Sequence, residues 1–108
     1  MKGCCVMTNK DIKGGCGFED VIELNDIQIT NTAKKSLTES EVYIALFRHT
    51  YHDWGLAPDE LWSLNDANFL KRNRVASCFE SSSGVLFTVS TDFGEKNKTV
   101  VALVSEIE

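Results

Sequence analysis

Long hydrophobic runs are missing from this sequence, and their absence argues against a membrane-spanning helix. No segment approaches the ~18 consecutive apolar residues that such a helix requires. Near the N-terminus, Lys2 is not followed by an apolar stretch, so we do not expect a secretory signal peptide. The sequence therefore predicts a cytoplasmic protein with no membrane partner, whose cysteine thiols stay reduced.

The four cysteines lack the paired spacing of a zinc site or a redox motif. Cys4, Cys5, Cys16 and Cys78 form no C-x-x-C pair. We therefore predict neither a bound metal nor another cofactor. Cys78 belongs to a strand pattern and is interpreted as a small buried hydrophobe, whereas the three N-terminal cysteines are expected to be exposed thiols.

Positive charge is also scarce. Eleven lysines and arginines face sixteen aspartates and glutamates, which gives a net charge of −5. Because nucleic-acid binders draw most of their affinity from neutralising phosphates, a nucleic-acid partner is not expected. The one basic cluster consists of Lys71, Arg72 and Arg74. It falls at the end of a predicted helix, where cations are favoured by the helix dipole.

Length and composition are those of one soluble globular domain. A chain of 108 residues, 43% hydrophobic and 25% charged, can bury a core without disulfides or metals. Residues 1–20 are rich in glycine and poor in large apolar residues, so we predict a flexible N-terminal leader there. Within it, Met1 and Met7 are both candidate start residues. A single domain is predicted over residues 21–108.

A helix is predicted after residue 37, because a capping box opens it. The hydroxyl of Thr38 can accept a hydrogen bond from the amide of Glu41, whose carboxylate can reach back to the Thr38 amide. An apolar stripe at helical spacing follows, widened by Phe47, and it comprises Val42, Ala45, Leu46 and His49. Because His49 continues this stripe, we predict that its ring is buried.

A second helix is predicted from Pro58 to about Arg72. Gly55 ends the preceding helix, and Pro58 is favoured at a first helical position, where an amide proton would have no intrahelical partner. Trp54 and Trp62 flank this restart. We expect them to pack the two helices together, although an exposed pair would instead anchor an interface.

Segments rich in β-branched residues frame these helices. Before them, Val21–Leu24 and Ile27–Thr30 predict either a short hairpin or one strand after an extended lead-in. After them, strands are predicted at Val75–Phe79, Val85–Thr91 and Thr99–Ser105, and their short connections indicate an antiparallel meander. The sequence therefore predicts an α+β domain, with two or three helices packed on one face of a small antiparallel sheet.

The last predicted strand also bears on assembly. Its residues 99–104 are nearly continuously apolar, a pattern typical of a strand that is covered on both faces or paired with another chain. If that strand lies uncovered in a three-stranded sheet, two copies can associate through it. We therefore predict a homodimer or larger homo-oligomer, formed through this strand or through the tryptophan-bearing helices.

The densest group of polar and aromatic residues lies between positions 48 and 55. This candidate binding site or structural junction comprises Arg48, His49, His52, Asp53 and Trp54, with Trp62 on the following helix. His49 and His52 are three residues apart and could share a helix face. Two ligands make an incomplete metal site, however, so no metal is predicted here.

Scattered residues between about 27 and 106 resemble a family of short proteins from plasmids and integrative elements. Its members show an Arg-His pair, a Gly-Asp-Trp-Gly block, a helix bearing Asn, an Arg-x-x-Ser strand and a Thr-rich last strand. The matching residues here are Ile29-Thr30, Ala45 to His49, Asp53-Trp54-Gly55, Asn65, Asn68, Arg74 to Ser77, Gly84 and Thr91. His52 and Asn73 stand where the family has glycine. The resemblance implies a mobile-element or gene-cassette context rather than an activity.

Two functions from different classes follow. The preferred interpretation is a non-catalytic accessory protein of a mobile element, which binds a protein or a small molecule as a homo-oligomer. The alternative is a small metal-independent ribonuclease-like domain of the toxin type, because histidine titrates near neutral pH and can act as a general acid or base. Its candidate residues are His49, Arg48, Arg74, Ser77 and Thr91. The acidic net charge disfavours that alternative.

Overall fold

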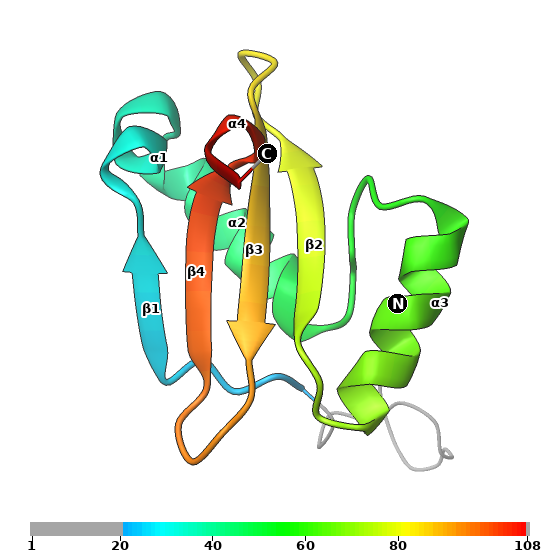
Figure 1. The fold of residues 1–108 in the computed structure, drawn as a ribbon. Coiled ribbons are helices and arrows are strands. Elements are labelled where there is room, and N and C mark those ends of the chain that lie inside the picture. The colour runs from blue at the N-terminus through cyan, green and yellow to red at the C-terminus, as the bar shows by residue number, and fades with distance from the viewer. Residues whose placement is uncertain (1–20, 108) are drawn as a thin grey trace, which may run out of the picture.

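A computed structural model of the protein describes residues 21–107 (Figure 1). The leader predicted at residues 1–20 lies outside these described residues, together with its three cysteines. Within 21–107, every helix is too short or too polar to cross a lipid bilayer. In chain order the elements are β1 (Asp26–Ile29), α1 (Asn31–Ser36), α2 (Glu39–Thr50), α3 (Asp59–Leu70), β2 (Val75–Glu80), β3 (Leu86–Asp92), β4 (Lys98–Leu103) and α4 (Val104–Ile107).

The strands form one four-stranded sheet in the order β1-β4-β3-β2. β2, β3 and β4 make the predicted antiparallel meander, and the α+β class is confirmed. β1 joins β4 in parallel, so the sheet is mixed rather than purely antiparallel. Parallel neighbours need a long crossover, and α1, α2, α3 and two strands separate β1 from β4 in the chain. Residues 21–24 form an extended lead-in, which decides between the two alternatives for this segment.

β4 lies inside the sheet, which corrects the expectation of an uncovered last strand. Val101 pairs with Ile29 of β1 on one side and with Val89 of β3 on the other. The apolar run of β4 is therefore accounted for by neighbours within the same chain. It offers no free edge to a second copy, so the argument for association through this strand no longer holds.

The last strand also ends earlier than predicted. After Leu103 the chain turns into α4, so Val104 and Ser105 are helical rather than extended. The carboxylate of Glu106 accepts hydrogen bonds from the Leu103 amide and the Thr30 hydroxyl, both at 2.8 Å. These contacts tie the C-terminal turn to the start of α1. A pattern of apolar residues gives no sign of them.

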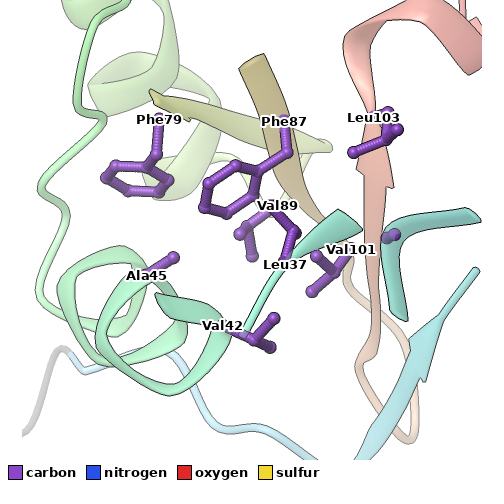
Figure 2. Close-up of a cluster of buried hydrophobic side chains, with 9 residues drawn as sticks. Leu37, Val42, Ala45, Phe79, Phe87, Val89, Val101 and Leu103 are labelled. Atoms are coloured by element: carbon purple, nitrogen blue, oxygen red, sulfur yellow. The ribbon is translucent and has the colours of Figure 1, made fainter. Parts of the chain in front are cut away.

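α2 packs across one face of the sheet and lies behind it in Figure 1. Its capping box forms as predicted: the Thr38 hydroxyl accepts from the Glu41 amide at 3.1 Å, and the Glu41 carboxylate accepts from the Thr38 amide at 2.9 Å. Figure 2 shows side chains of α2 and the sheet meeting in the main core. Its buried residues are Ala33, Leu37, Val42, Ala45, Phe79, Phe87, Val89, Val101 and Leu103. Burial of this apolar surface is the main stabilising contribution.

α3 lies beside β2, and the segment that leads into it closes the outer edge of that strand (Figure 1). The amide of Leu56 donates to the carbonyl of Cys78 at 2.7 Å, and the amide of Cys78 donates to the carbonyl of Trp54 at 3.1 Å. A second buried cluster forms here from Ile22, Trp54, Phe69 and Val75. Because β2 pairs its edge groups within the chain, it is protected from edge-to-edge association.

Candidate functional site

The turn that follows α2 carries most of the residues singled out in the sequence. α2 ends at Thr50, and the chain reverses through two residues in the left-handed region, His52 (φ 66°) and Gly55 (φ 70°). A Cβ atom at Gly55 would lie 2.1 Å from the carbonyl oxygen of Cys78, so only glycine fits there. Gly55 therefore allows the turn that follows α2 to approach the backbone of β2 closely.

Arg48 and Asp53 form an ion pair that spans this turn. The Arg48 Nε atom lies 2.7 Å from Asp53 Oδ2, and the guanidinium lies over the ring of Phe79, 4.8 Å from its centroid. Asp53 Oδ1 also accepts from the Gly55 amide at 3.1 Å. Both charged side chains are more than a third exposed, so the pair contributes little to stability. Its effect is to fix the shape of the turn.

The two tryptophans join the turn to α3. Trp54 is fully buried, and its indole nitrogen donates to Asp66 at 2.9 Å. The indole nitrogen of Trp62 donates to the carbonyl of Gly55 at 3.4 Å. The ring of His52 stacks on that of Trp54 with centroids 5.6 Å apart. Trp54 thus contacts both α2, through His49, and α3, through Asp66, whereas Trp62 contacts the turn that joins the two helices.

His49 is fully buried, as the apolar stripe of α2 predicts, and it organises a polar network in the core. Its Nδ1 atom hydrogen-bonds with the hydroxyl of Ser77 on β2, and its Nε2 atom with that of Thr91 on β3 at 2.8 Å. Thr91 in turn hydrogen-bonds with Thr99 on β4 at 2.9 Å. The network therefore links α2 to three strands, and both ring nitrogens are satisfied by hydroxyl groups.

The electrostatics of His49 fit a structural role. Burial, with a smaller contribution from the charge of His52, lowers the pKa of His49 from 6.5 to about 4. The imidazole is therefore neutral at physiological pH, and a neutral ring can donate from one nitrogen and accept at the other. The exposed fraction of His49 is 0%, so a substrate cannot reach its ring in this conformation.

The residues proposed for a ribonuclease separate into two groups. His49, Ser77 and Thr91 come together, but all three are buried. Arg48 is paired with Asp53 at the turn, whereas the Arg74 guanidinium donates to the hydroxyl of Ser90 at 3.2 Å. Neither Arg48 nor Arg74 therefore lies beside His49, as phosphate binding next to a general base would require.

Thr99 and Asn65 are buried polar residues that the sequence-based site does not include. Thr99 extends the network, and only its cross-strand pairing with Thr91 reveals it. Asn65 is 8% exposed, and its amide bonds to the backbone of Ala76. The signal for Asn65 is its position among apolar residues on the inward side of α3, between Trp62 and Phe69. A polar residue at such a position needs a partner.

The largest departure from the sequence analysis lies on the outward side of α2. Phe47 does not widen the buried face as expected, since it is 57% exposed. Tyr43, Ile44 and Tyr51 are also exposed, by 72%, 56% and 48%. The rings of Phe47 and Tyr51 contact each other with centroids 4.9 Å apart. We call these four residues the α2 outer face.

A groove of about 440 Å³ runs along one flank of the α2 outer face. Ile29 of β1 and Leu37 line it together with Leu46 and Tyr43 of α2, and Lys34 and Glu39 contribute to its rim. Tyr43 thus belongs to both the outer face and the groove. The two features form one continuous, largely apolar surface over β1, α1 and α2.

Metal chemistry has no visible site in the part of the chain described by the structure. Among residues 21–107, no three His, Cys, Asp or Glu side chains are grouped so that they could hold an ion. Burial raises the pKa of the Cys78 thiol, which makes it a weak nucleophile. No family model, curated protein or solved structure matches this chain. Inference about function therefore rests on the geometry of the residues.

Proposed function

We propose that the protein is a non-catalytic module that binds another protein through the α2 outer face. The observation that carries this proposal is a helix that is apolar on both sides. The inward side of α2 packs in the core, and the outward side presents Tyr43, Ile44, Phe47 and Tyr51. A contiguous apolar patch on the exposed side of a helix is typical of an interaction surface, so the outward side is expected to be covered in the working assembly.

The composition of the α2 outer face supports this role. Three of its four side chains are aromatic, and tyrosine and phenylalanine are enriched at the centres of protein interfaces. An aromatic side chain buries a large area and loses few rotamers on binding, because only two torsions become fixed. Tyr43 also carries a hydroxyl group that can satisfy a polar group of a partner.

The other face of the sheet is a weaker candidate for the binding surface. Cross-strand neighbours Thr88 and Ala102 lie on it, as do Ser90 and Val100. These side chains are small, and the Arg74 guanidinium lies 3.8 Å from the Asp92 carboxylate at its margin. An antiparallel sheet tolerates such a small, partly polar face in water without a partner.

The cellular setting of this proposal comes from the sequence. The resemblance to plasmid and integrative-element proteins supports a cytoplasmic accessory role in a mobile genetic element, with the bound protein as its target. A catalytic role as a ribonuclease has less support. The histidine that would act as base has both nitrogens hydrogen-bonded inside the core, and the arginines are engaged elsewhere.

Site-specific photo-crosslinking tests the proposal. We would replace Phe47 or Ile44 by p-benzoylphenylalanine and irradiate cells that express the variant. Leu64 on α3, which is 52% exposed, is the matched control position. We expect one discrete crosslinked protein, identified by mass spectrometry, from both α2 positions and not from Leu64. Absence of a product from both α2 positions, or the same products from all three, would contradict the proposal.

A further inference from the structure

We propose that the protein covering the α2 outer face is a second copy of this chain, so that two α2 helices pack against each other across a two-fold axis. This inference rests on the proposed function and names its partner. It does not use β4, which is internal to the sheet. It places the interface instead on the outward side of α2 and the groove beside it.

The first argument is that this surface carries both halves of a self-complementary contact. The side chains of the α2 outer face form an apolar ridge, and the groove lined by Ile29, Leu37 and Leu46 runs beside it. In a two-fold interface each copy presents the same patch, so a ridge must find its groove within that patch. Because Tyr43 borders both features, the ridge of one copy can enter the groove of the other.

The second argument concerns charge. A two-fold axis brings the centre of the patch against itself, so a charged residue there would face a like charge. The four residues of the α2 outer face carry no charge, while Glu39 and Arg48 lie on its flanks. Two copies with a net charge of −5 repel each other overall, so an uncharged centre is what close approach of two copies requires.

The third argument is area. From their exposed fractions, the four side chains present on the order of 500 Å². A standard stable interface buries about 800 Å² on each partner. The groove supplies further apolar surface next to the ridge. Ile27, which is 41% exposed, lies two residues before the groove residue Ile29 on β1. The patch is therefore large enough to form the central part of a dimer interface.

Sedimentation equilibrium of the reduced full-length protein tests the inference. We expect the wild type to show twice the chain mass of 12.0 kDa at high micromolar concentration. Phe47→Glu and Tyr43→Glu should each weaken dimerisation at least ~30-fold, the effect of losing an interface hot spot. Leu64→Glu on α3 is the control and should leave dimerisation unchanged. Circular dichroism of each variant verifies that it is folded.

Photo-crosslinking at Phe47 supplies a second, independent measurement. A product of twice the chain mass, joined to residues 39–51 of the other copy, would support the inference. A monomeric wild type would overturn it, as would a dimer that Phe47→Glu and Tyr43→Glu leave intact while folded. If Phe47 crosslinks only to a different protein, the proposed function stands and this inference fails. If it crosslinks to nothing, both fail.

Discussion

The side-chain amide of Asn65 hydrogen-bonds with the backbone of Ala76 on the outer edge of β2, where a neighbouring strand would otherwise pair. Its nitrogen donates to the Ala76 carbonyl at 2.8 Å, and its oxygen accepts from the Ala76 amide at 3.2 Å. A primary amide reproduces the donor and acceptor pair of a peptide group, which explains why asparagine suits this position. The contact continues the edge closure begun by the segment 54–56 and holds α3 beside the sheet.

We predict that Asn65→Asp lowers the free energy of unfolding by about 2–3 kcal/mol. The carboxylate keeps the shape of the amide but cannot donate to the Ala76 carbonyl, and it places a charge in a nearly buried position. Asn68→Asp on the same helix is the control, since its side chain makes no such backbone contact within residues 21–107. Urea denaturation of both variants measures the difference. Equal stabilities would contradict the structural role of Asn65.

The buried histidine predicts a specific pH dependence. The pKa of His49 is about 4 in the folded protein, whereas a histidine in an unfolded chain has its ordinary pKa of 6.5. Between these two pH values the unfolded chain therefore binds more protons than the folded protein. The free energy of unfolding should therefore fall as the pH drops from 6.5 to 4, by up to about 1.4 kcal/mol per pH unit and about 3 kcal/mol in total. The contribution of His49 levels off about one pH unit above 6.5, where the ring is neutral in both states.

Carboxylates change the free energy of unfolding at lower pH, so their contribution can be separated from that of His49. Hydrogen bonds from Thr38, and then from Ser82, lower the pKa of Glu41 from 4.5 to about 2, so its contribution is lost below about pH 4.5. Urea denaturation between about pH 5 and pH 7 therefore tests His49 outside the range in which Glu41 contributes. The His49→Gln variant should have a lower free energy of unfolding than the wild type at pH 7. Between about pH 5 and pH 7 its free energy of unfolding should depend less steeply on pH, because the titrating imidazole has been removed. An unchanged slope in a folded variant would mean that His49 is not the titrating group.

The close approach of Gly55 to β2 gives a further prediction. Gly55→Ala should destabilise the protein by more than about 3 kcal/mol, because its Cβ would overlap the Cys78 carbonyl oxygen and the ring of Phe79. Gly94→Ala is the control, since its Cβ would have only an ordinary contact 3.7 Å from the Lys96 carbonyl. Thermal denaturation compares the two. Similar melting temperatures would show that the turn after α2 can move away from β2.

Local signals in the sequence predicted the parts of this fold that depend on neighbouring residues. The capping box at Thr38, the burial of His49 and the β2–β4 meander all follow from patterns within a few residues. The parallel addition of β1 could not be predicted, because it pairs segments about 70 residues apart. The exposure of Phe47 was missed because an apolar residue beside a buried stripe resembles part of that stripe.

The same reasoning applies to the candidate site. The cluster between residues 48 and 55 is real, but its chemistry depends on which groups β2 and β3 bring to it. Ser77 and Thr91 come 28 and 42 residues after His49 in the chain. Their hydroxyls hydrogen-bond with both ring nitrogens of His49, which would otherwise be available to act as a base. Their distance along the chain leaves no local pattern. Only the pairing of the strands places these hydroxyls against the ring.

The last prediction separates a binding protein from a ribonuclease. Because His49, the general base proposed for a ribonuclease, is enclosed in the core, RNA cannot reach its ring. High-level expression in a bacterium should therefore not arrest growth, and total RNA should remain intact. Growth curves and electrophoresis of total RNA measure both effects. Growth arrest that is relieved by His49→Ala or by Arg74→Ala would reverse the ranking of the two functions. Arg74→Ala is the more informative variant, because His49→Ala also removes a core contact. The guanidinium of Arg74 contacts Ser90 and lies near Asp92 at the surface of the sheet. Its loss should therefore alter phosphate binding without unfolding the protein.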